Sequence, residues 1–204
     1  MTDARQQLIE FISGEAVFHG DFTLTSGKKA TYYIDLRKVS LDHRVAPLIG
    51  QVMVDLIARI ERGDGHGGDG QGAEGQAAEE QRVDAVGGLT MGADPIAAAV
   101  LHQGVARGLT YDAFVVRKEP KDHGRGKQVE GPDLAGKRVV VLEDTSTTGG
   151  SPLKAIEALR AVGAEIVAVA VVVDRATGAR EVIEKAGYRY FAAIDLADLG
   201  LEPQ

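Results

Sequence analysis

One run of the chain, residues 139–151, constrains the fold more than any other segment. It begins with four apolar residues, continues with Glu143 and Asp144, and then passes through hydroxyl and glycine residues to Ser151. A helix-like segment follows, with Pro152 in its first turn. A buried strand that ends in this way delivers polar groups to the carboxyl edge of a sheet, where open α/β sheets bind their ligands. The run therefore predicts an α/β fold with a ligand-binding loop at this edge.

The residue types in this loop suit a phosphate and a sugar together. Backbone N–H groups and hydroxyls can turn onto phosphate oxygens at Thr147, Thr148, Gly149 and Gly150. Glu143 and Asp144 would repel a phosphate, but they suit the hydroxyls of a ribose or a bridging metal ion. A phosphorylated ribose is the predicted ligand, and the alternative is an ordinary strand–turn–helix connection with a polar cap. The loop lacks the Gly-Lys-Ser/Thr of a Walker loop and the Gly-x-Gly-x-x-Gly of a dinucleotide site.

The rest of the chain alternates between strand-like and helix-like patterns. Helices are expected at 3–13, 45–60, 95–107, 152–162 and 177–186, extended segments at 22–38, 83–86, 113–117, 138–142, 166–173 and 188–194, and a long polar loop at 118–136. The clearest helix is 45–60, where apolar residues recur at i, i+3, i+4 and i+7. The alternation predicts an α/β class with a central, mostly parallel sheet flanked by helices. Residues 1–204 are expected to form a single domain.

Residues 63–81 differ in kind from their surroundings. Seven of these nineteen residues are glycine, and none is more apolar than alanine. Burial of such a stretch cannot offset its ordering entropy. The segment is therefore interpreted as a flexible Gly-rich insertion on the surface, between a helix and the next strand.

Composition excludes several functional classes. The net charge of −7 argues against a nucleic-acid binder that relies on bulk positive charge, and the absence of cysteine excludes disulfides and thiolate chemistry. The N-terminus lacks the apolar core of a signal peptide, and the longest apolar run, 166–173, is eight residues, too short to cross a bilayer. A soluble cytoplasmic protein without membrane or nucleic-acid partners is expected.

A second cluster of charge lies at residues 117–127. This stretch holds five basic residues and His123 in eleven positions of an acidic chain, and it follows a predicted strand. A solvated loop is the simpler interpretation. Beside a phosphate loop, the segment is better explained as a lid that neutralises a diphosphate and excludes water from a reactive sugar.

Three weaker segments complete the set of candidates. Residues 87–95 place small residues between a strand end and a helix, as many ordinary turns do. Arg175 follows Asp174 at the end of the buried strand 166–173; the pair is either a salt bridge or a means of presenting an arginine to an anionic substrate. Residues 22–35 are compatible with a surface hairpin.

These motifs together resemble a known family. The Glu-Asp-Thr-Ser-Thr-Thr-Gly-Gly-Ser loop at 143–151 resembles the phosphoribosyl diphosphate (PRPP) motif of type I phosphoribosyltransferases. The Arg-Lys-Glu-x-Lys-x-His-Gly run from Arg117, the Thr-Leu-Thr-Ser-Gly-Lys segment at 23–28 and the late Asp-Arg pair are similar to the orotate branch of that family. The resemblance covers nearly the whole chain except 63–81.

The resemblance implies both an activity and a fold. The activity is a pentosyl transfer in pyrimidine (UMP) biosynthesis: ribose 5-phosphate passes from PRPP to orotate, giving orotidine 5′-monophosphate and diphosphate, with Mg²⁺ bound alongside PRPP. The fold is a central parallel sheet with a small hood, formed here by residues 1–40. The family works as homodimers in which the lid of one subunit reaches the neighbouring site.

The resemblance also implies roles for individual residues. Catalytic roles fall to Lys118, Lys121, His123 and Asp144. Contacts to PRPP fall to Arg117, Lys118, Lys121, His123, Glu143, Asp144, Thr145, Ser146, Thr147, Thr148, Gly149, Gly150 and Ser151, with Lys118 acting from the partner subunit. Contacts to orotate fall to Thr147 and Arg175, and no residue is assigned as a metal ligand.

Two departures from the family pattern and two rival functions remain at this point. Some relatives carry a lysine where this chain has Thr25, and a Tyr-Lys pair where it has Met91 and Gly92, so those lysine contacts do not transfer. Lys28 or Lys29 could substitute for the first.

The rival functions are transfer to another base, such as a purine, and a PRPP-sensing regulator without catalysis. The intact lid and the absence of a helix-turn-helix extension or basic arm disfavour the regulator. A purely structural α/β domain leaves the clustered phosphate chemistry unexplained.

Overall fold

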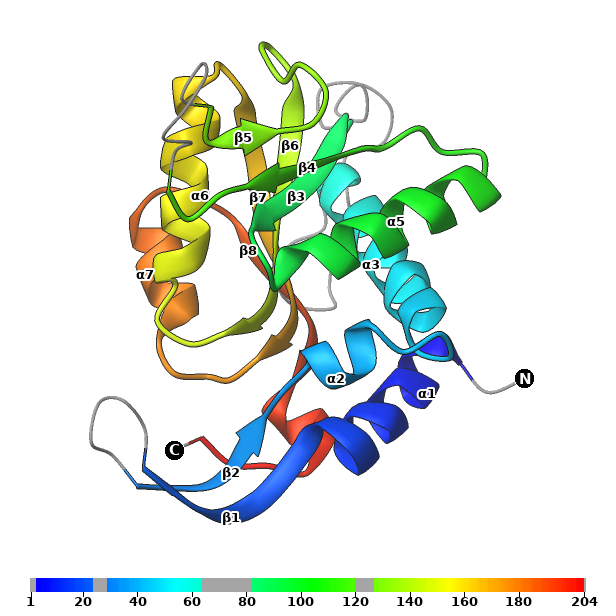
Figure 1. The fold of residues 1–204 in the computed structure, drawn as a ribbon, viewed down its shortest axis with the longest axis vertical. Coiled ribbons are helices and arrows are strands. Elements are labelled where there is room, and N and C mark those ends of the chain that lie inside the picture. Colours follow the sequence, from blue (N-terminus) through cyan, green and yellow to red (C-terminus); the bar gives the residue numbers. More distant parts are fainter. Residues whose placement is uncertain (1–2, 24–28, 64–81, 120–126, 204) are drawn as a thin grey trace.

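A twisted sheet of six strands forms the centre of the protein (Figure 1). The computed structural model describes residues 3–23, 29–63, 82–119 and 127–203. The strands are β3 (Ala85–Leu89), β4 (Asp112–Val116), β5 (Val129–Glu130), β6 (Arg138–Ser146), β7 (Glu165–Asp174) and β8 (Tyr190–Asp195), in the order β5-β4-β3-β6-β7-β8. Neighbouring strands are parallel except for the antiparallel pair β4–β5. The predicted mostly parallel sheet is confirmed.

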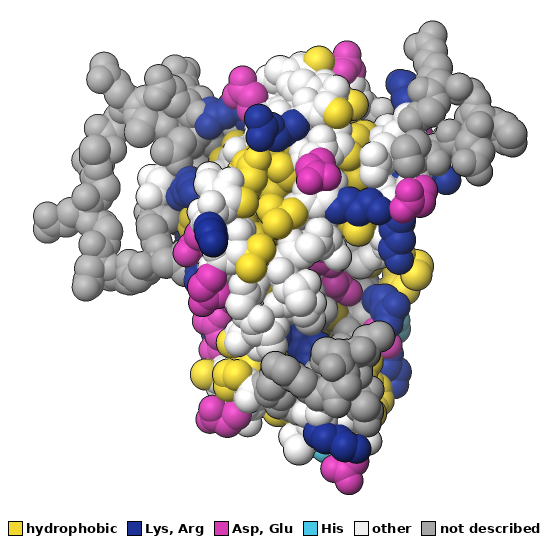
Figure 2. Space-filling view, turned by 90° about the vertical axis from the view of Figure 1, so that its left-hand side faces the viewer, with side chains coloured by type: hydrophobic (Ala, Val, Ile, Leu, Met, Phe, Trp, Pro, Cys, Tyr) yellow, Lys and Arg dark blue, Asp and Glu magenta, His cyan; other side chains and the backbone are white. Residues whose placement is uncertain are grey.

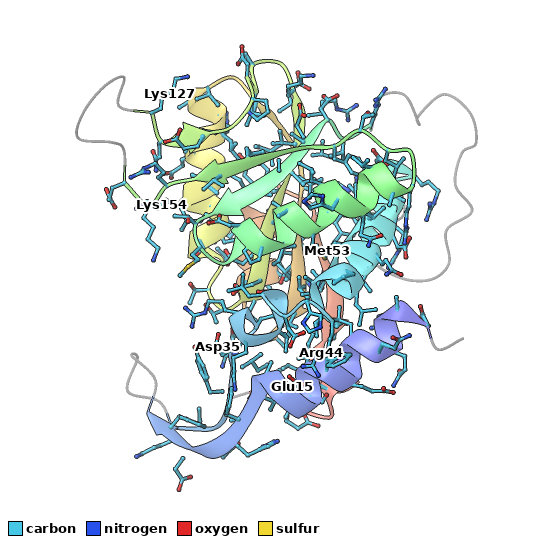
Figure 3. All side chains as sticks on the ribbon, turned by 45° about the vertical axis from the view of Figure 1, so that its right-hand side comes forward. Glu15, Asp35, Arg44, Met53, Lys127 and Lys154 are labelled. Carbon is cyan, nitrogen blue, oxygen red and sulfur yellow. The ribbon has the colours of Figure 1, made fainter. Side chains whose placement is uncertain are left out.

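Helices cover both faces of this sheet (Figure 1). They are α3 (Ala46–Glu61) and α5 (Ala93–Ala106) on one face, and α6 (Gly150–Ala161) and α7 (Ala179–Lys185) on the other. Alternate residues of β6 enter the two cores: Val140 packs toward α3 and α5, and Val141 toward α6. Strands that are buried on both faces explain the apolar runs in the sequence. Met53 of α3 is fully buried (Figure 3).

A small N-terminal layer lies at the end of the sheet where β6 and β7 finish (Figure 1). It consists of α1 (Ala4–Phe11), a π-helical turn (Ile12–Ala16), the antiparallel strands β1 (Val17–Thr23) and β2 (Lys29–Ile34), and α2 (Arg37–Ser40). A 3₁₀ turn near the C-terminus, Leu196–Leu199, joins it. The side chain of Arg5 donates from Nε to the carbonyl of Ala193 at 3.0 Å, and Tyr32 donates its hydroxyl to the carbonyl of Glu202 at 2.8 Å. The C-terminus therefore helps to hold this layer in place.

Several predicted boundaries were wrong at the strand ends. The predicted strand at 138–142 continues to Ser146, so Glu143 and Asp144 are strand residues, because β6 pairs with β7 as far as the Ser146–Asp174 register. The predicted strand at 83–86 is displaced to Ala85–Leu89. It includes two glycines because the neighbouring strands come so close: a Cβ at Gly87 would meet the carbonyl oxygen of Phe114 at 2.0 Å.

The N-terminal region also differs from expectation. The segment predicted as extended, 22–38, contains β2 but ends in the helix α2, and the chain is already a strand from Val17. The polar loop predicted at 118–136 contains the short strand β5. Apart from Gly63, the predicted insertion 63–81 lies outside the described residues, as does Thr25. No helix in the described part of the chain is both long and apolar enough to span a membrane.

The surface carries charges of both signs. Figure 2 shows Lys and Arg side chains interspersed with Asp and Glu over the described part of one face.

Candidate active site

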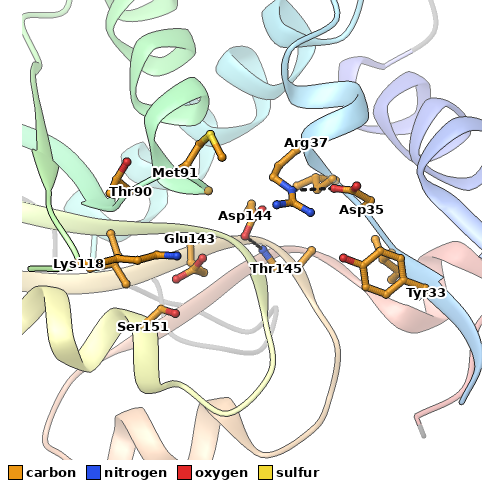
Figure 4. A pocket seen from close by; sticks show the side chains of 14 residues that line it. Tyr33, Asp35, Arg37, Thr90, Met91, Lys118, Glu143, Asp144, Thr145 and Ser151 are labelled. Atoms are coloured by element: carbon orange, nitrogen blue, oxygen red, sulfur yellow. Dashed lines mark hydrogen bonds and ion pairs between the residues drawn. The ribbon is translucent and has the colours of Figure 1, made fainter. Parts of the chain in front are cut away.

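A cavity of about 300 Å³ opens at the carboxyl ends of β3 and β6, against the N-terminal layer (Figure 4). Its walls come from four segments that are distant in sequence. They are the end of β2 with the start of α2, the turn after β3, Lys118 after β4, and the end of β6 with the start of α6. The lining residues are Tyr33, Ile34, Asp35, Leu36, Arg37, Leu89, Thr90, Met91, Gly92, Lys118, Glu143, Asp144, Thr145 and Ser151.

The two carboxylates at the end of β6 occupy different environments. Glu143 is only 8% exposed, and its Oε2 has no hydrogen-bond partner among the described residues. Burial, together with the neighbouring Asp144, raises the pKa of Glu143 to about 9. Asp144 accepts the backbone N–H of Thr145 on Oδ1 at 2.7 Å. A buried carboxyl oxygen that lacks a partner is ready to bind a hydroxyl or a cation.

The loop after β6 leads directly into α6 and presents backbone N–H donors. Gly149 has φ +77°, in the left-handed region that favours glycine, and α6 begins directly after it without a side-chain cap. The first N–H groups of α6 are therefore available to an anion. Thr177 donates its hydroxyl to the carbonyl of Thr147 at 2.6 Å, which ties the loop to the turn after β7.

The hydroxyl of Ser146 faces the protein interior. Ser146 is 1% exposed, and its side chain bonds to Asp174 and Tyr190. Its hydroxyl is therefore already engaged, whereas Ser151, at the start of α6, lines the cavity.

The N-terminal layer contributes a cationic wall that the sequence did not reveal. Arg37 donates from Nε to Oδ1 of Asp35 at 2.9 Å, and both residues line the cavity (Figure 4). Asp35 is the main cause of a raised pKa for Arg37, with smaller effects from Tyr33 and Asp144. The segment 22–35 was a candidate, but only the folding of this layer over the sheet brings Arg37 to Asp144.

The turn after β3 forms the opposite wall. The Thr90–Met91 peptide bond is cis, and the Thr90 hydroxyl donates to Oδ2 of Asp94 at 2.7 Å. Met91 is 60% exposed at the cavity, and Gly92 packs directly against the Asp144 carboxylate. The weak motif at 87–95 is thus part of the site.

Other predicted site residues are only partly assembled here. Lys118 lines the cavity and points toward Glu143 (Figure 4), while Arg117 lies outside the lining and its guanidinium is 4.0 Å from Glu130. Arg175 is buried at 9% exposure, and its Nε has no partner among the described residues. Lys121 and His123 lie outside the described residues.

The residues present fit a cation shared with a bound ligand better than a protein-only metal site. No group of three or more His, Asp or Glu side chains in the described ranges is arranged to hold a metal ion. Magnesium commonly takes one or two carboxylates together with substrate oxygens, and Glu143 and Asp144 supply such a pair.

Comparison with known proteins gives one consistent result. Residues 75–196 match the family model described as the phosphoribosyl transferase domain. The chain is 53% identical over 203 residues to the orotate phosphoribosyltransferase of Streptomyces coelicolor, covering 99% of this chain and all of that protein.

Solved structures agree with the sequence relatives. The crystal structure of Mycobacterium tuberculosis orotate phosphoribosyltransferase in complex with Fe(III) dicitrate matches with a TM-score of 0.79 at 46% identity, covering 97% of this chain and 99% of that one. The structure of the same enzyme in complex with PRPP matches with a TM-score of 0.75 at 43% identity, with the same coverage. From its sequence, its fold and its cavity, the chain belongs to the phosphoribosyltransferase family, in the orotate phosphoribosyltransferase branch.

Proposed function

We propose that this protein transfers ribose 5-phosphate from PRPP to N1 of orotate, releasing orotidine 5′-monophosphate and diphosphate. The observation that carries the proposal is the meeting, in one cavity, of two carboxylates, a flanking pair of hydroxyls and two cations. They are the buried Glu143 and the half-buried Asp144, Thr145 and Ser151 on either side of the loop before α6, and Arg37 and Lys118. The family membership supports the same reaction. The reaction is a step of pyrimidine (UMP) biosynthesis, which we place in the cytoplasm. We treat residues 1–204 as one domain, with a hood formed by residues 1–40.

PRPP would lie along the end of β6. The N–H groups of Thr147–Gly150 and the first turn of α6 would hold the 5-phosphate, and Thr145 and Ser151 would close around it. Glu143 and Asp144 would take the ribose hydroxyls. Ser146 would contribute through its backbone, because its hydroxyl is bonded inside the protein.

Catalysis would rest on charge placed for the transition state. As the bond from ribose C1 to the diphosphate oxygen lengthens, positive charge develops on the sugar and negative charge on the leaving group. Glu143 and Asp144 stabilise the first charge, and Lys118, Lys121, His123 and Arg117 the second. Interactions that strengthen only in the transition state raise turnover. Orotate is already acidic, so no strong general base is needed, and His123 would interact with the diphosphate.

Mg²⁺ would bind together with PRPP. Glu143 and Asp144 are the residues that could hold it, directly or through the ribose hydroxyls, and the ion would neutralise charge on the diphosphate. In the free protein the raised pKa of Glu143 keeps its carboxyl protonated at neutral pH. A cation or a ribose hydroxyl would therefore displace or share that proton.

Orotate would occupy the side of the cavity under the N-terminal layer. Thr147 and Arg175 are the proposed contacts. The unpartnered Nε of the buried Arg175 supports this role, because a buried guanidinium needs an acceptor.

We also propose that the enzyme is a homodimer in which the lid acts between subunits, with Lys118 supplied by the partner. In the single chain, Lys118 lines its own cavity. Mixing the inactive variants Lys118→Ala and Asp144→Asn decides the arrangement. Recovered activity supports exchange between subunits, and no recovery places Lys118 in its own site.

The direct test follows the ultraviolet absorbance of orotate with PRPP and Mg²⁺ present. We expect orotate loss that depends on PRPP and is matched by diphosphate release. If orotate is not consumed, adenine, hypoxanthine, guanine and uracil are tried in turn. Consumption of one of these would show a different base specificity, and consumption of none would favour a PRPP sensor.

A further inference from the structure

Three buried polar side chains form a chain of hydrogen bonds behind the cavity, next to the strands that carry the site. Tyr190 of β8 donates its hydroxyl to Oγ of Ser146 at 2.6 Å, and Ser146 donates to Oδ1 of Asp174 at 3.0 Å. The exposed fractions of Tyr190, Ser146 and Asp174 are 1%, 1% and 6%. None of the three lines the cavity. Buried polar groups are costly unless paired, and here each one pairs with the next.

The network joins the two ends of the site. Ser146 is the last residue of β6, directly before the loop 147–149 that leads into α6, here called the phosphate loop. Asp174 is the last residue of β7, directly before Arg175. The two are register partners across the strands. Asp174 Oδ1 also accepts the backbone N–H of Ala176 at 2.9 Å, and Ala176 has φ +50°, in the left-handed region. One carboxylate oxygen thus contacts both the start of the phosphate loop and the turn that presents Arg175.

A fourth side chain, Arg180 of α7, contacts two members of the network. Cζ of Arg180 lies 4.7 Å from the centroid of the Tyr190 ring, and Nη2 of Arg180 is 3.6 Å from Oδ2 of Asp174. Arg180 is also 3.9 Å from Glu184. Together these contacts restrain the side-chain rotamers of Tyr190 and Asp174. The phosphate loop alone, or the turn alone, could not fix these rotamers.

We propose that Ser146, Asp174 and Tyr190 form a positioning network that sets the phosphate loop and the Arg175 turn in register with each other. These side chains touch no substrate; they act through the segments that do. The inference rests on the proposed function, because it assigns those two segments to PRPP and to the base. Displacement of a contact by about 1 Å can cost roughly 10²-fold in rate, so a network of this kind has catalytic consequences.

The test compares two deletions of a buried tyrosine hydroxyl. Tyr190→Phe removes the outer member of the network. Tyr111→Phe is the matched control: Tyr111 is 7% exposed, and its hydroxyl bonds to Glu61 at 3.4 Å, next to the amino end of β4 and away from the cavity. For each variant, kcat, the KM for PRPP, the KM for orotate and Tm are measured.

We expect Tyr190→Phe to lower kcat/KM by about tenfold for both substrates. Loosening the network would shift both the phosphate loop and the turn that presents Arg175. Tyr111→Phe should keep wild-type kinetics at a similar loss of Tm. Ser146→Ala should reproduce the kinetic loss, and the double variant should be no worse than Ser146→Ala alone, because the two hydroxyls act in one network.

Wild-type kcat/KM for both substrates in Tyr190→Phe and Ser146→Ala would overturn the proposal, as would equal kinetic losses in Tyr111→Phe. If Tyr190→Phe does not fold, Ser146→Ala decides the question by itself. Calorimetric titration with PRPP, without orotate, separates this inference from the proposed function. If the wild type consumes no orotate, weaker PRPP binding by Tyr190→Phe than by Tyr111→Phe still supports the network, and equal binding overturns it.

Discussion

Gly92 lies so close to Asp144 that a Cβ atom at position 92 would be 2.8 Å from Oδ1 of the carboxylate. That same oxygen accepts the backbone N–H of Thr145 at 2.7 Å. The carboxylate therefore cannot retreat without losing a charge-assisted hydrogen bond. The bare backbone of Gly92 is what leaves room for Asp144 at the wall of the cavity.

Gly92→Ala should lower the activity while leaving the stability of the fold nearly unchanged. The added methyl group displaces the Asp144 carboxylate, and a shift of that kind lowers kcat/KM by roughly ten- to a hundredfold. Stability should change little, because the contact is with the end of one side chain at the cavity. Steady-state kinetics and thermal melting measure the two effects. Gly14→Ala is the control, since a Cβ there meets nothing within 4 Å. Equal activity in the two variants would contradict the argument.

Glu143→Gln should make the ligand-free protein more stable at alkaline pH. Burial raises the pKa of Glu143 from 4.5 to about 9, so between these values the folded state holds a proton that the unfolded state releases. The stability contribution of Glu143 is thus complete below pH 4.5 and is lost as the pH rises toward 9. Glutamine has no such loss, and the gain at pH 8 should be on the order of a few kcal/mol. Thermal melting across the pH range measures it, with the two curves converging near pH 4.5.

The same variant should lose activity. Glutamine cannot supply negative charge to a developing ribose cation, so kcat should fall by roughly 10²–10³. Parallel stability curves for wild type and Glu143→Gln would show that the pKa of Glu143 is not raised. An unchanged kcat would show that its charge is not used.

The spacing of apolar residues and the local residue types were enough to predict the segments whose structure depends on near neighbours in the sequence. The helix at 45–60 follows from its apolar period, and α3 occupies Ala46–Glu61. The runs at 138–142 and 166–173 are strands because both faces of the sheet are covered. The loop that follows β6 could be predicted from its hydroxyls and glycines, although it begins after Ser146 and not after the predicted strand end at Leu142.

Features that depend on distant contacts could not be predicted in this way. Strand β1 contains Gly20 and Asp21, which disfavour strands, and it forms because β2 pairs with it. Arg37 enters the site only when the N-terminal layer folds over the end of the sheet. The engagement of the Ser146 hydroxyl depends on β8 lying beside β7. No spacing in the sequence encodes these contacts.

Arg37→Ala should weaken the binding of the anionic base. Its guanidinium is a cation on the wall of the cavity beneath the N-terminal layer, and the loss of a charged hydrogen bond costs about 1.5–3 kcal/mol, or roughly ten- to a hundredfold in the KM for orotate. Arg44→Ala is a matched control: its side chain is 46% exposed, against 47% for Arg37, and it also pairs with carboxylates, but outside the cavity (Figure 3). Initial rates at varied orotate distinguish the two, and an equal KM in both variants would remove Arg37 from the site.

Lys121→Ala should lower turnover strongly and leave the fold intact. Lys121 belongs to the basic run 117–127, which follows β4 and whose second residue, Lys118, lines the cavity. Its ammonium would balance the charge that gathers on diphosphate as the ribose bond breaks, so its loss should cost roughly 10²–10³ in kcat. The Tm should equal that of the wild type, which checks that the fold is intact. Single-turnover kinetics with saturating PRPP isolate the chemical step, with Lys185→Ala, an exposed lysine of α7, as the charge-matched control. Unchanged turnover in Lys121→Ala would exclude this residue from leaving-group stabilisation and transfer that role to Lys118, His123 and the bound metal ion.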